Sequence, residues 1–267
     1  HRDLHSFPTR RSSDLKNGIL RQILVVLAVV LTIVVNTLAN ALPLNGLNTG
    51  EISDSFKVYF VPAGYVFSIW GLIYLGLMAF AIFQALPSQR ENPRIQKIAG
   101  WFILGSLANI AWIFLWHYQQ FPVTLLAMLT LLVSLILIYL KLGIGTGLKV
   151  TSAETWMVRV PFSLYLGWIT VATIANVTDV LYYANWNGWG IAPQVWAVIM
   201  LAVAVVVAAL MALLKRDAVY RAVLVWAFAG IAFKFQGTNL VFMAALIAAV
   251  LVALLGIYSL VMRLRTK

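Results

Sequence analysis

Aromatic residues recur in the apolar part of the sequence at the spacing of one helical face. Phe67, Trp70 and Tyr74 stand at positions i, i+3 and i+7, so they form one stripe if the segment is a helix. Such a stripe can line a pocket and hold a flat apolar molecule by stacking, or it can pack one helix against another. The spacing alone leaves both interpretations open.

Two later segments repeat this pattern and add amide side chains. Asn109, Trp112 and Trp116 have the same spacing, and a further helical face ends beside Asn176. An asparagine side chain is costly in hydrocarbon unless it finds a partner, so we expect Asn109 and Asn176 to point into a helix bundle. Three inward aromatic faces with two buried amides predict a cavity between the helices. The last of these faces carries Tyr165, Trp168, Ala172 and Ala175.

The composition is that of a polytopic membrane protein. Of the 267 residues, 63% are hydrophobic and 10% are charged, and the mean hydropathy of +0.93 excludes a soluble globular domain. Cysteine is absent, which excludes disulfides, a thiol nucleophile and a thiolate metal site. The net charge of +11 comes from short connections between apolar runs, so it is better explained by membrane topology than by a nucleic-acid partner.

Eight apolar segments predict the fold class, which is an all-α polytopic membrane helix bundle. The segments are too long and too continuously apolar for the alternating strands of an outer-membrane barrel. The seventh segment is short and carries Lys234. The expected helices span about 22–42, 64–86, 95–118, 123–142, 156–181, 193–214, 219–235 and 240–262.

The polar parts of the chain carry further expectations. Residues 1–15 resemble translated sequencing-adapter read-through, so we expect a non-native segment there and set it aside. The connection 43–61 is the longest and is expected to act as a lid over a cavity. Asp179 and His117 are expected to be solvated helix ends at the outer surface, and Lys234 is expected to extend toward the interface.

The basic residues predict the orientation. With eight alternating segments, fourteen of the sixteen Lys and Arg residues from position 16 onward fall on one side, and only Lys57 and Lys234 fall on the other. Cytoplasmic loops carry the excess of Lys and Arg. We therefore expect both termini in the cytoplasm, connection 43–61 outside, and the inner membrane of a bacterium as the location.

The aromatic segments resemble the TspO/MBR family, the tryptophan-rich sensory proteins that include the mitochondrial translocator protein. Members carry the pattern P-P-G-W-V-F-G-P-V-W-x-x-x-Y entering helix two, to which residues 62–67 with Trp70 and Tyr74 are similar. The family's N-x-x-W in helix three matches Asn109 and Trp112. Its Y-L-x-W-x-x-x-A-x-x-x-N in helix five matches Tyr165, Trp168, Ala172 and Asn176. The resemblance covers residues 22–183.

The chain departs from the family pattern at two points. Between Phe67 and Trp70 it has one residue fewer, which rotates Trp70 by about 100° relative to Phe67 in a helix. Leu164 stands where the family has a proline, and Pro161 lies one turn earlier. We expect a TspO-like five-helix core at 16–183 and about three additional transmembrane helices at 184–267.

The resemblance implies a bundle that binds porphyrins, or other hydrophobic molecules such as cholesterol, in an intramembrane pocket with a sensory, regulatory or translocator role. The expected partners are membrane lipid and this small molecule, and a homodimer is left open. No cofactor is expected to be required, although the bound ligand can be a haem-like tetrapyrrole. The ligand-binding residues that it implies are Phe67, Trp70, Tyr74, Asn109, Trp112, Trp168, Ala172 and Asn176.

Other functional classes are weighed against this one. No catalytic signature of a known type is present, and the light- or oxygen-dependent turnover suggested for the family would be chemistry of the ligand. A secondary transporter of a small hydrophobic solute would show paired repeats and buried acid pairs, of which none is convincing here. A membrane scaffold without a small ligand is the remaining alternative.

Overall fold

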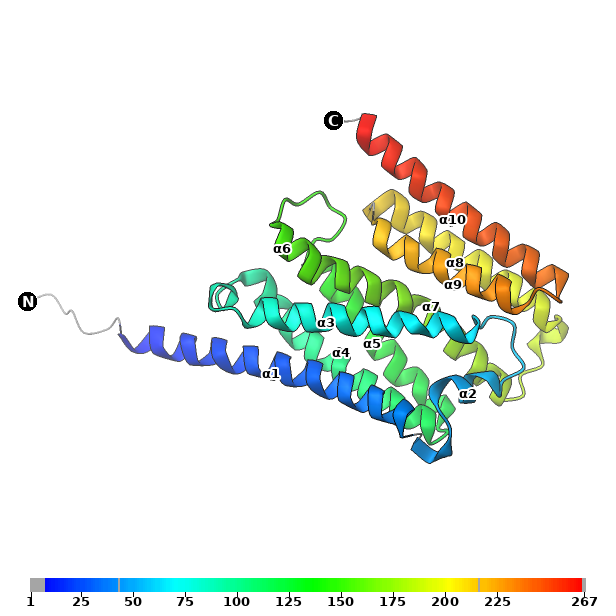
Figure 1. The fold of residues 1–267 in the computed structure, drawn as a ribbon, viewed down its shortest axis with the longest axis horizontal. Helices are drawn as coiled ribbons and strands as arrows, with labels where there is room; N and C mark the ends of the chain where they lie inside the picture. Colours follow the sequence, from blue (N-terminus) through cyan, green and yellow to red (C-terminus); the bar gives the residue numbers. More distant parts are fainter. Residues whose placement is uncertain (1–7, 43, 216, 266–267) are drawn as a thin grey trace, which may run out of the picture.

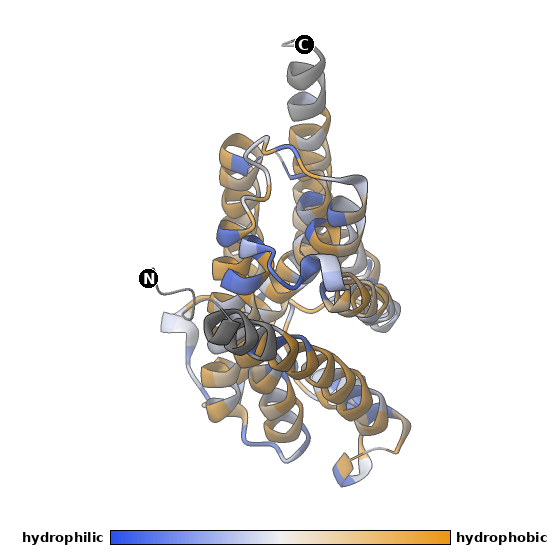
Figure 2. Ribbon diagram, turned by 90° about the vertical axis from the view of Figure 1, so that its left-hand side faces the viewer, coloured by the Kyte–Doolittle hydropathy of each residue, from blue (hydrophilic) through white to orange (hydrophobic). Residues whose placement is uncertain are grey.

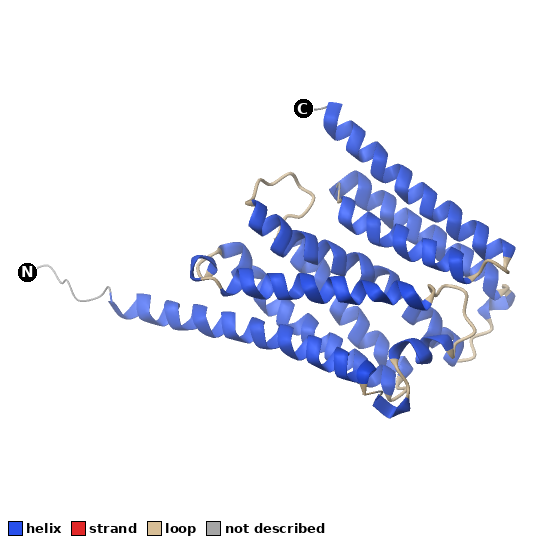
Figure 3. Cartoon of the chain, viewed as in Figure 1, coloured by secondary structure: helices blue, strands red, loops and turns tan. Residues whose placement is uncertain are grey.

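The chain folds into a bundle of long helices (Figure 1). The structure is a computed structural model that describes residues 8–42, 44–215 and 217–265. Within those residues all regular secondary structure is helical, without strands (Figure 3), so the all-α prediction is confirmed. The eight long helices are α1 (Pro8–Ala41), α3 (Ile69–Ala85), α4 (Pro93–His117), α5 (Phe121–Lys141), α7 (Val160–Tyr183), α8 (Pro193–Lys215), α9 (Ala218–Lys234) and α10 (Asn239–Arg265). Short pieces complete the chain: η1 (Leu44–Gly46), α2 (Thr49–Asp54), η2 (Gly64–Ser68), η3 (Pro87–Gln89), α6 (Ser152–Glu154), η4 (Thr155–Arg159) and η5 (Gly188–Gly190).

Seven of these helical stretches, in the described part of the chain, are long and apolar enough to cross a membrane. The exception is α9, whose 17 residues extend about 25 Å against a hydrocarbon thickness of about 30 Å. Leu224, Ala227 and Phe228 of α9 are fully buried because this helix packs against α7 and α10. The predicted eight helices are therefore all present, with α9 sheltered by its neighbours.

The outward faces of the long helices are apolar, as expected for side chains in contact with lipid. On α1, Leu20, Leu27 and Leu31 are exposed, and Leu213 and Leu214 are exposed on α8. Figure 2 shows hydrophobic residues along the helices, with hydrophilic residues mostly at their ends and in the connections. The chain is a multi-pass integral membrane protein.

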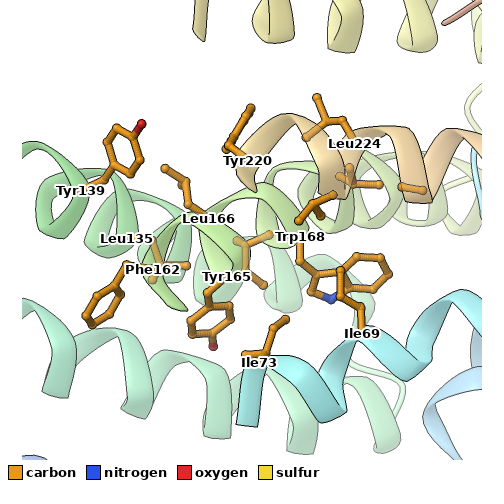
Figure 4. Packing of buried hydrophobic residues seen from close by; sticks show 14 of the residues in the cluster. Ile69, Ile73, Leu135, Tyr139, Phe162, Tyr165, Leu166, Trp168, Tyr220 and Leu224 are labelled. Atoms are coloured by element: carbon orange, nitrogen blue, oxygen red, sulfur yellow. The ribbon is translucent and has the colours of Figure 1, made fainter. Parts of the chain in front are cut away.

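Helix α7 lies at the centre of the bundle, between α3 on one side and α9 on the other. Figure 4 shows Tyr165 and Trp168 reaching from α7 toward Ile69 and Ile73 of α3, while Tyr220 of α9 approaches α7 from the opposite side. The approach of α3 is close because Gly76 has no side chain: a Cβ added there would lie 2.9 Å from Pro161 Cβ. The position of α7 lets its inward face contribute to any cavity in the core.

The fifth predicted helix differs from the expectation at its start. Residues 155–159 form a π-helical turn, and α7 begins only at Val160, with Pro161 in its first turn. Proline has no N–H to donate and clashes with the preceding turn, so the wider turn before it accommodates the ring. The first helix also begins earlier than expected, at Pro8. The non-native origin of residues 1–15 stays a prediction, and residues 1–7 lie outside the described part.

Basic residues gather at one end of the bundle, with partners that hold the helix ends together. The Arg21 Nη2 donates to the carbonyl of Arg90 at 2.5 Å, joining α1 to the α3–α4 connection. Arg159 is buried and donates to the carbonyls of Leu142 at 2.9 Å and Leu148 at 3.3 Å, beyond the end of α5. Arg216 and Lys267, which belong to the same predicted side, lie outside the described residues, as does Pro43.

This charge distribution predicts that fusions at the C-terminal end report a cytoplasmic location. The connection of α9 to α10 is four residues long, so the two helices run antiparallel, and the end of α10 returns to the side of the basic residues. A fluorescent protein fused after Lys267 should fluoresce, and alkaline phosphatase fused there should be inactive. Phosphatase inserted after Gly46 is the matched control and should be active. An active phosphatase at the C-terminal end would contradict the predicted topology.

Candidate functional site

A narrow pocket lies in the core between α3, α4, α5 and α7, and we call it the inner pocket. Its volume is about 50 Å³, and its walls are mostly apolar. Trp116, Met128 and Leu131 are among the residues that line it, with Thr49 and Asp179 near its outer end. Seven of the eight predicted ligand-binding residues line this pocket: Phe67, Trp70, Asn109, Trp112, Trp168, Ala172 and Asn176.

A larger opening adjoins the inner pocket, and we call it the outer cleft. Its volume is about 730 Å³, and it lies between α1, the α2 segment, α3 and α4. The eighth predicted residue, Tyr74, lines this cleft. Ligand pockets usually measure about 300–1,000 Å³, so the outer cleft is large enough for a tetrapyrrole or sterol and the inner pocket is not. Four residues line both spaces: Thr49, Phe67, Trp70 and Trp112.

Four rings of the site, those of Phe67, Trp70, Tyr74 and Trp168, form one connected aromatic cluster. Trp70 stacks on Tyr74 with 5.6 Å between ring centroids and 28° between planes. Trp168 meets the rings of Phe67 at 5.6 Å and Trp70 at 6.3 Å, both edge-on. Phe67, Trp70, Tyr74 and Trp112 are half-buried, so parts of their surfaces remain available to a bound molecule.

The one-residue difference from the family pattern does not turn either ring away from the site. Residues 64–68 form the 3-10 turn η2, and the α-helical conformation starts at Ile69. A 3-10 turn advances each residue by about 120° instead of about 100°. Phe67 and Trp70 therefore both face the inner pocket and the outer cleft.

The two predicted amides point into the bundle and already have partners in the protein. Asn109 is 1% exposed and its Oδ1 accepts a hydrogen bond from Asn36 Nδ2 at 2.7 Å, which links α4 to α1. Asn176 Nδ2 donates to Thr124 Oγ1 at 2.9 Å, and Asn176 Oδ1 accepts from Trp112 Nε1 at 3.2 Å. The prediction that both amides lie inside the bundle is confirmed, and their hydrogen bonds stabilise the shape of the site.

The first helix is among those predicted to enclose the site, with the second, third and fifth, but its polar residues were not singled out as lining. Asn36, Thr37 and Asn40 line the outer cleft, and Asn36 is 3% exposed. A signal for this wall was present, because Asn36 and Asn40 stand four residues apart in an otherwise apolar segment. Such polar residues in a spanning helix usually face the bundle interior or a cavity.

The long connection after α1 covers the outer end of the site, and contacts with α4 hold it there. Helix α2 starts with a capping box in which Asn48 and Glu51 each accept a hydrogen bond from the other's backbone N–H. Trp116 Nε1 donates to the carbonyl of Thr49 at 3.3 Å. His117 Nε2 lies 3.1 Å from Thr49 Oγ1. These contacts hold the connection against the end of α4, and its action as a lid stays a prediction.

Two polar residues differ from the expectation of solvated helix ends. His117 is 1% exposed, because its Nδ1 approaches the carbonyl of Leu44 at 3.1 Å and η1 covers it. Asp179 is 3% exposed beneath the same connection. Lys234 is partly exposed and forms an ion pair with the exposed Asp54 at 2.6 Å, so its predicted extension toward the interface is not contradicted. The expectation of solvated helix ends is wrong for His117 and Asp179 because a folded connection covers these ends of α4 and α7.

Comparison with known proteins identifies the family. Residues 22–258 match the family described as TSPO-like protein. The chain belongs to this family. No curated protein and no solved structure matches the chain significantly.

The TSPO-like match extends beyond the expected 22–183, includes α8 and α9, and ends within α10. Their packing agrees with this wider extent, because α9 contacts the turn that leads into α3. Trp226 Nε1 donates to the carbonyl of Val66 at 3.2 Å, and the N–H of Ala63 donates to the carbonyl of Gly230 at 3.2 Å. The C-terminal helices of this TSPO-like protein thus support the position of Phe67. The domain boundary at 183/184 stays a prediction.

Proposed function

We propose that this TSPO-like protein binds a hydrophobic planar molecule, a tetrapyrrole or a sterol-like compound, in the outer cleft. The observation that carries the proposal is the cleft of about 730 Å³ with Phe67, Trp70, Tyr74 and Trp112 along its wall. Aromatic faces stack on flat apolar molecules, and a cleft of this size has room for one. A porphyrin is the ligand that the family resemblance favours.

The lid and the polar wall support this proposal. Asn40 accepts a hydrogen bond from the N–H of Thr49 at 3.1 Å, so α1 and the α2 segment meet at the edge of the cleft. The ion pair of Asp54 with Lys234 links the same segment to α9. Because Asp54 is largely exposed, this pair contributes at most about 1 kcal/mol. A lid held by several weak contacts can open to admit a ligand and close over it.

The biological role proposed with this binding is sensory, regulatory or translocating, in a bacterial inner membrane with both termini in the cytoplasm. A homodimer belongs to the same proposal. Ion-coupled transport is less well supported: Glu154 and Asp217, two of the buried acids, lie near helix ends and not at the membrane midplane. Flux of the bound compound into proteoliposomes would distinguish a translocator from a sensor.

Titration of the purified protein with protoporphyrin IX tests the proposal. The site holds several tryptophans, so binding should quench tryptophan fluorescence in a saturable manner, with one porphyrin bound per chain. Empty nanodiscs of the same lipid provide the background for partition into the bilayer. Quenching that rises linearly with porphyrin, as partition alone predicts, would contradict a binding site.

A further inference from the structure

The buried acidic side chains differ in whether the protein neutralises them. Glu154 accepts two hydrogen bonds from Arg94, at 2.6 and 3.0 Å, and lies 3.7 Å from Arg159 Nε. Asp217 accepts a hydrogen bond from the Tyr139 hydroxyl at 2.9 Å, and others from the first N–H groups of α9. Both carboxylates are therefore held by donors of the protein itself.

Asp179 is the exception among the buried acids in the described part of the chain. It is 3% exposed, and its Oδ1 has no hydrogen-bond partner. Lys234, the basic residue at the end of α9, is held by Asp54 of the lid and makes no ion pair with Asp179 within 4 Å. A buried carboxylate oxygen without a hydrogen-bond partner is costly. Asp179 also lines the inner pocket, so that pocket is where a partner can reach it.

The inner pocket has a second polar atom without a partner. Trp168 Nε1 is buried and makes no hydrogen bond, although buried indoles usually find an acceptor. Trp168, Ala172, Asn176 and Asp179 share one face of α7, with about 16 Å along the helix axis between the first and the last. The small side chains of Ala172 and Ala175 keep the space between them open. A slot thus runs along α7 from an indole to a carboxylate.

Aromatic rings surround this slot. Trp112 and Trp116 stack with 5.2 Å between centroids and 18° between planes, and both line the inner pocket with Trp168. A positive group is attracted to the face of an indole and to a carboxylate, and the attraction is strongest where water is excluded. The site therefore favours a compact cation.

The chemistry of the other side chains favours an organic cation over a metal ion. Asn109 Oδ1 and Asn176 Oδ1 already accept hydrogen bonds from Asn36 and Trp112. No group of three or more His, Cys, Asp or Glu side chains that could hold a metal occurs among the described residues. Calcium and magnesium need about six oxygen ligands, whereas an ammonium group needs a few acceptors and benefits from the rings.

We propose that, among the planar ligands of this TSPO-like protein, those that carry a protonated amine are preferred, because the amine enters the inner pocket and pairs with Asp179. This inference rests on the proposed function. The planar body lies in the outer cleft against Trp70 and Tyr74, and the amine passes Thr49 and Trp112, which line both spaces. The inner pocket, at about 50 Å³, has room for such a group but not for the ring system. Asp179 then favours cationic over neutral planar compounds of similar size.

Two pyrene compounds that differ in one group test the inference. Binding of 1-pyrenemethylamine and 1-pyrenemethanol is measured by fluorescence in nanodiscs of zwitterionic lipid, with the native chain and with Asp179→Asn. The native chain should bind the amine at least about tenfold more tightly than the alcohol, which corresponds to one charge-assisted contact. In Asp179→Asn this preference should disappear, and affinity for the alcohol should change by less than about twofold.

The controls separate this inference from the proposed function. Glu91→Gln removes one negative charge from the exposed α3–α4 connection and should leave the preference for the amine unchanged. If Asp179→Asn does not yield folded protein, Asp179→Ala replaces it. Equal binding of amine and alcohol to the native chain, or an unchanged preference in the Asp179 variants, would overturn the inference alone. Failure of both compounds to bind the native chain would overturn the proposed function together with it.

Discussion

Replacing Trp70 or Trp112 by alanine is expected to weaken binding of a planar ligand by roughly tenfold or more. Both side chains are half-buried and line the inner pocket and the outer cleft. One stacked ring contributes about 0.5 to 1.5 kcal/mol beyond the apolar area that it buries, and about 1.4 kcal/mol changes a dissociation constant tenfold. The measurement is the porphyrin titration, repeated for each variant.

The choice of variants follows from the burial of the rings. Trp168 is 2% exposed, so Trp168→Ala would leave a cavity and cost about 3–5 kcal/mol of stability. Ala172→Leu tests the same region without removing a contact, because it adds bulk inside the inner pocket. Ala172→Leu should therefore weaken the binding of any ligand that places a group in the inner pocket.

The control for these variants is Trp156→Ala. Trp156 is 70% exposed in the π-helical turn that precedes α7. Trp226 is unsuitable as a control, although it lies in α9, because its indole donates to Val66 beside the site. If Trp156→Ala weakens porphyrin binding as much as Trp112→Ala does, with both variants folded, the ligand does not lie in the outer cleft.

The helices were predictable from the sequence because long apolar runs have few alternatives in a membrane. A run of about twenty apolar residues must satisfy its backbone groups internally, so α5 and α8 follow from hydropathy alone. The inward faces were predictable as well, since Asn109 and Asn176 are too polar to face lipid. The ends of the helices were less predictable. The π-helical turn before α7, for example, depends on the ring of Pro161 and on the residues that pack around it.

Contacts between distant segments were not predictable in the same way. His117 and Asp179 stand at the ends of apolar runs, where solvation is the usual state. They are buried because α2 and η1 fold back over α4 and α7. The sequence of the connection shows its length and its polar residues, but not the surface on which it packs. The division of the site into a small inner pocket and a large outer cleft also depends on such contacts.

The docking of α9 on the turn before α3 depends on a glycine, and this dependence leads to the second large prediction. Gly230 packs directly against η2: a Cβ added at this position would overlap Cγ2 of Val66, which is fully buried. Gly230→Ala is expected to destabilise the protein by about 1–3 kcal/mol, because neither backbone can move without breaking the hydrogen bond from Ala63 to Gly230. Thermal unfolding in detergent measures the loss.

A rescue variant and a control make the reason for this loss testable. Val66→Ala removes the methyl group that a new Cβ would meet, so the double variant Val66→Ala/Gly230→Ala should be more stable than Gly230→Ala alone. Gly100→Ala, in the middle of α4, meets no atom within 4 Å and should leave stability unchanged or raise it by up to about 1 kcal/mol. Because η2 carries Phe67, Gly230→Ala should also weaken porphyrin binding, and the double variant should recover part of it. Loss of stability without any change in affinity would show that α9 supports the bundle but not the ligand site.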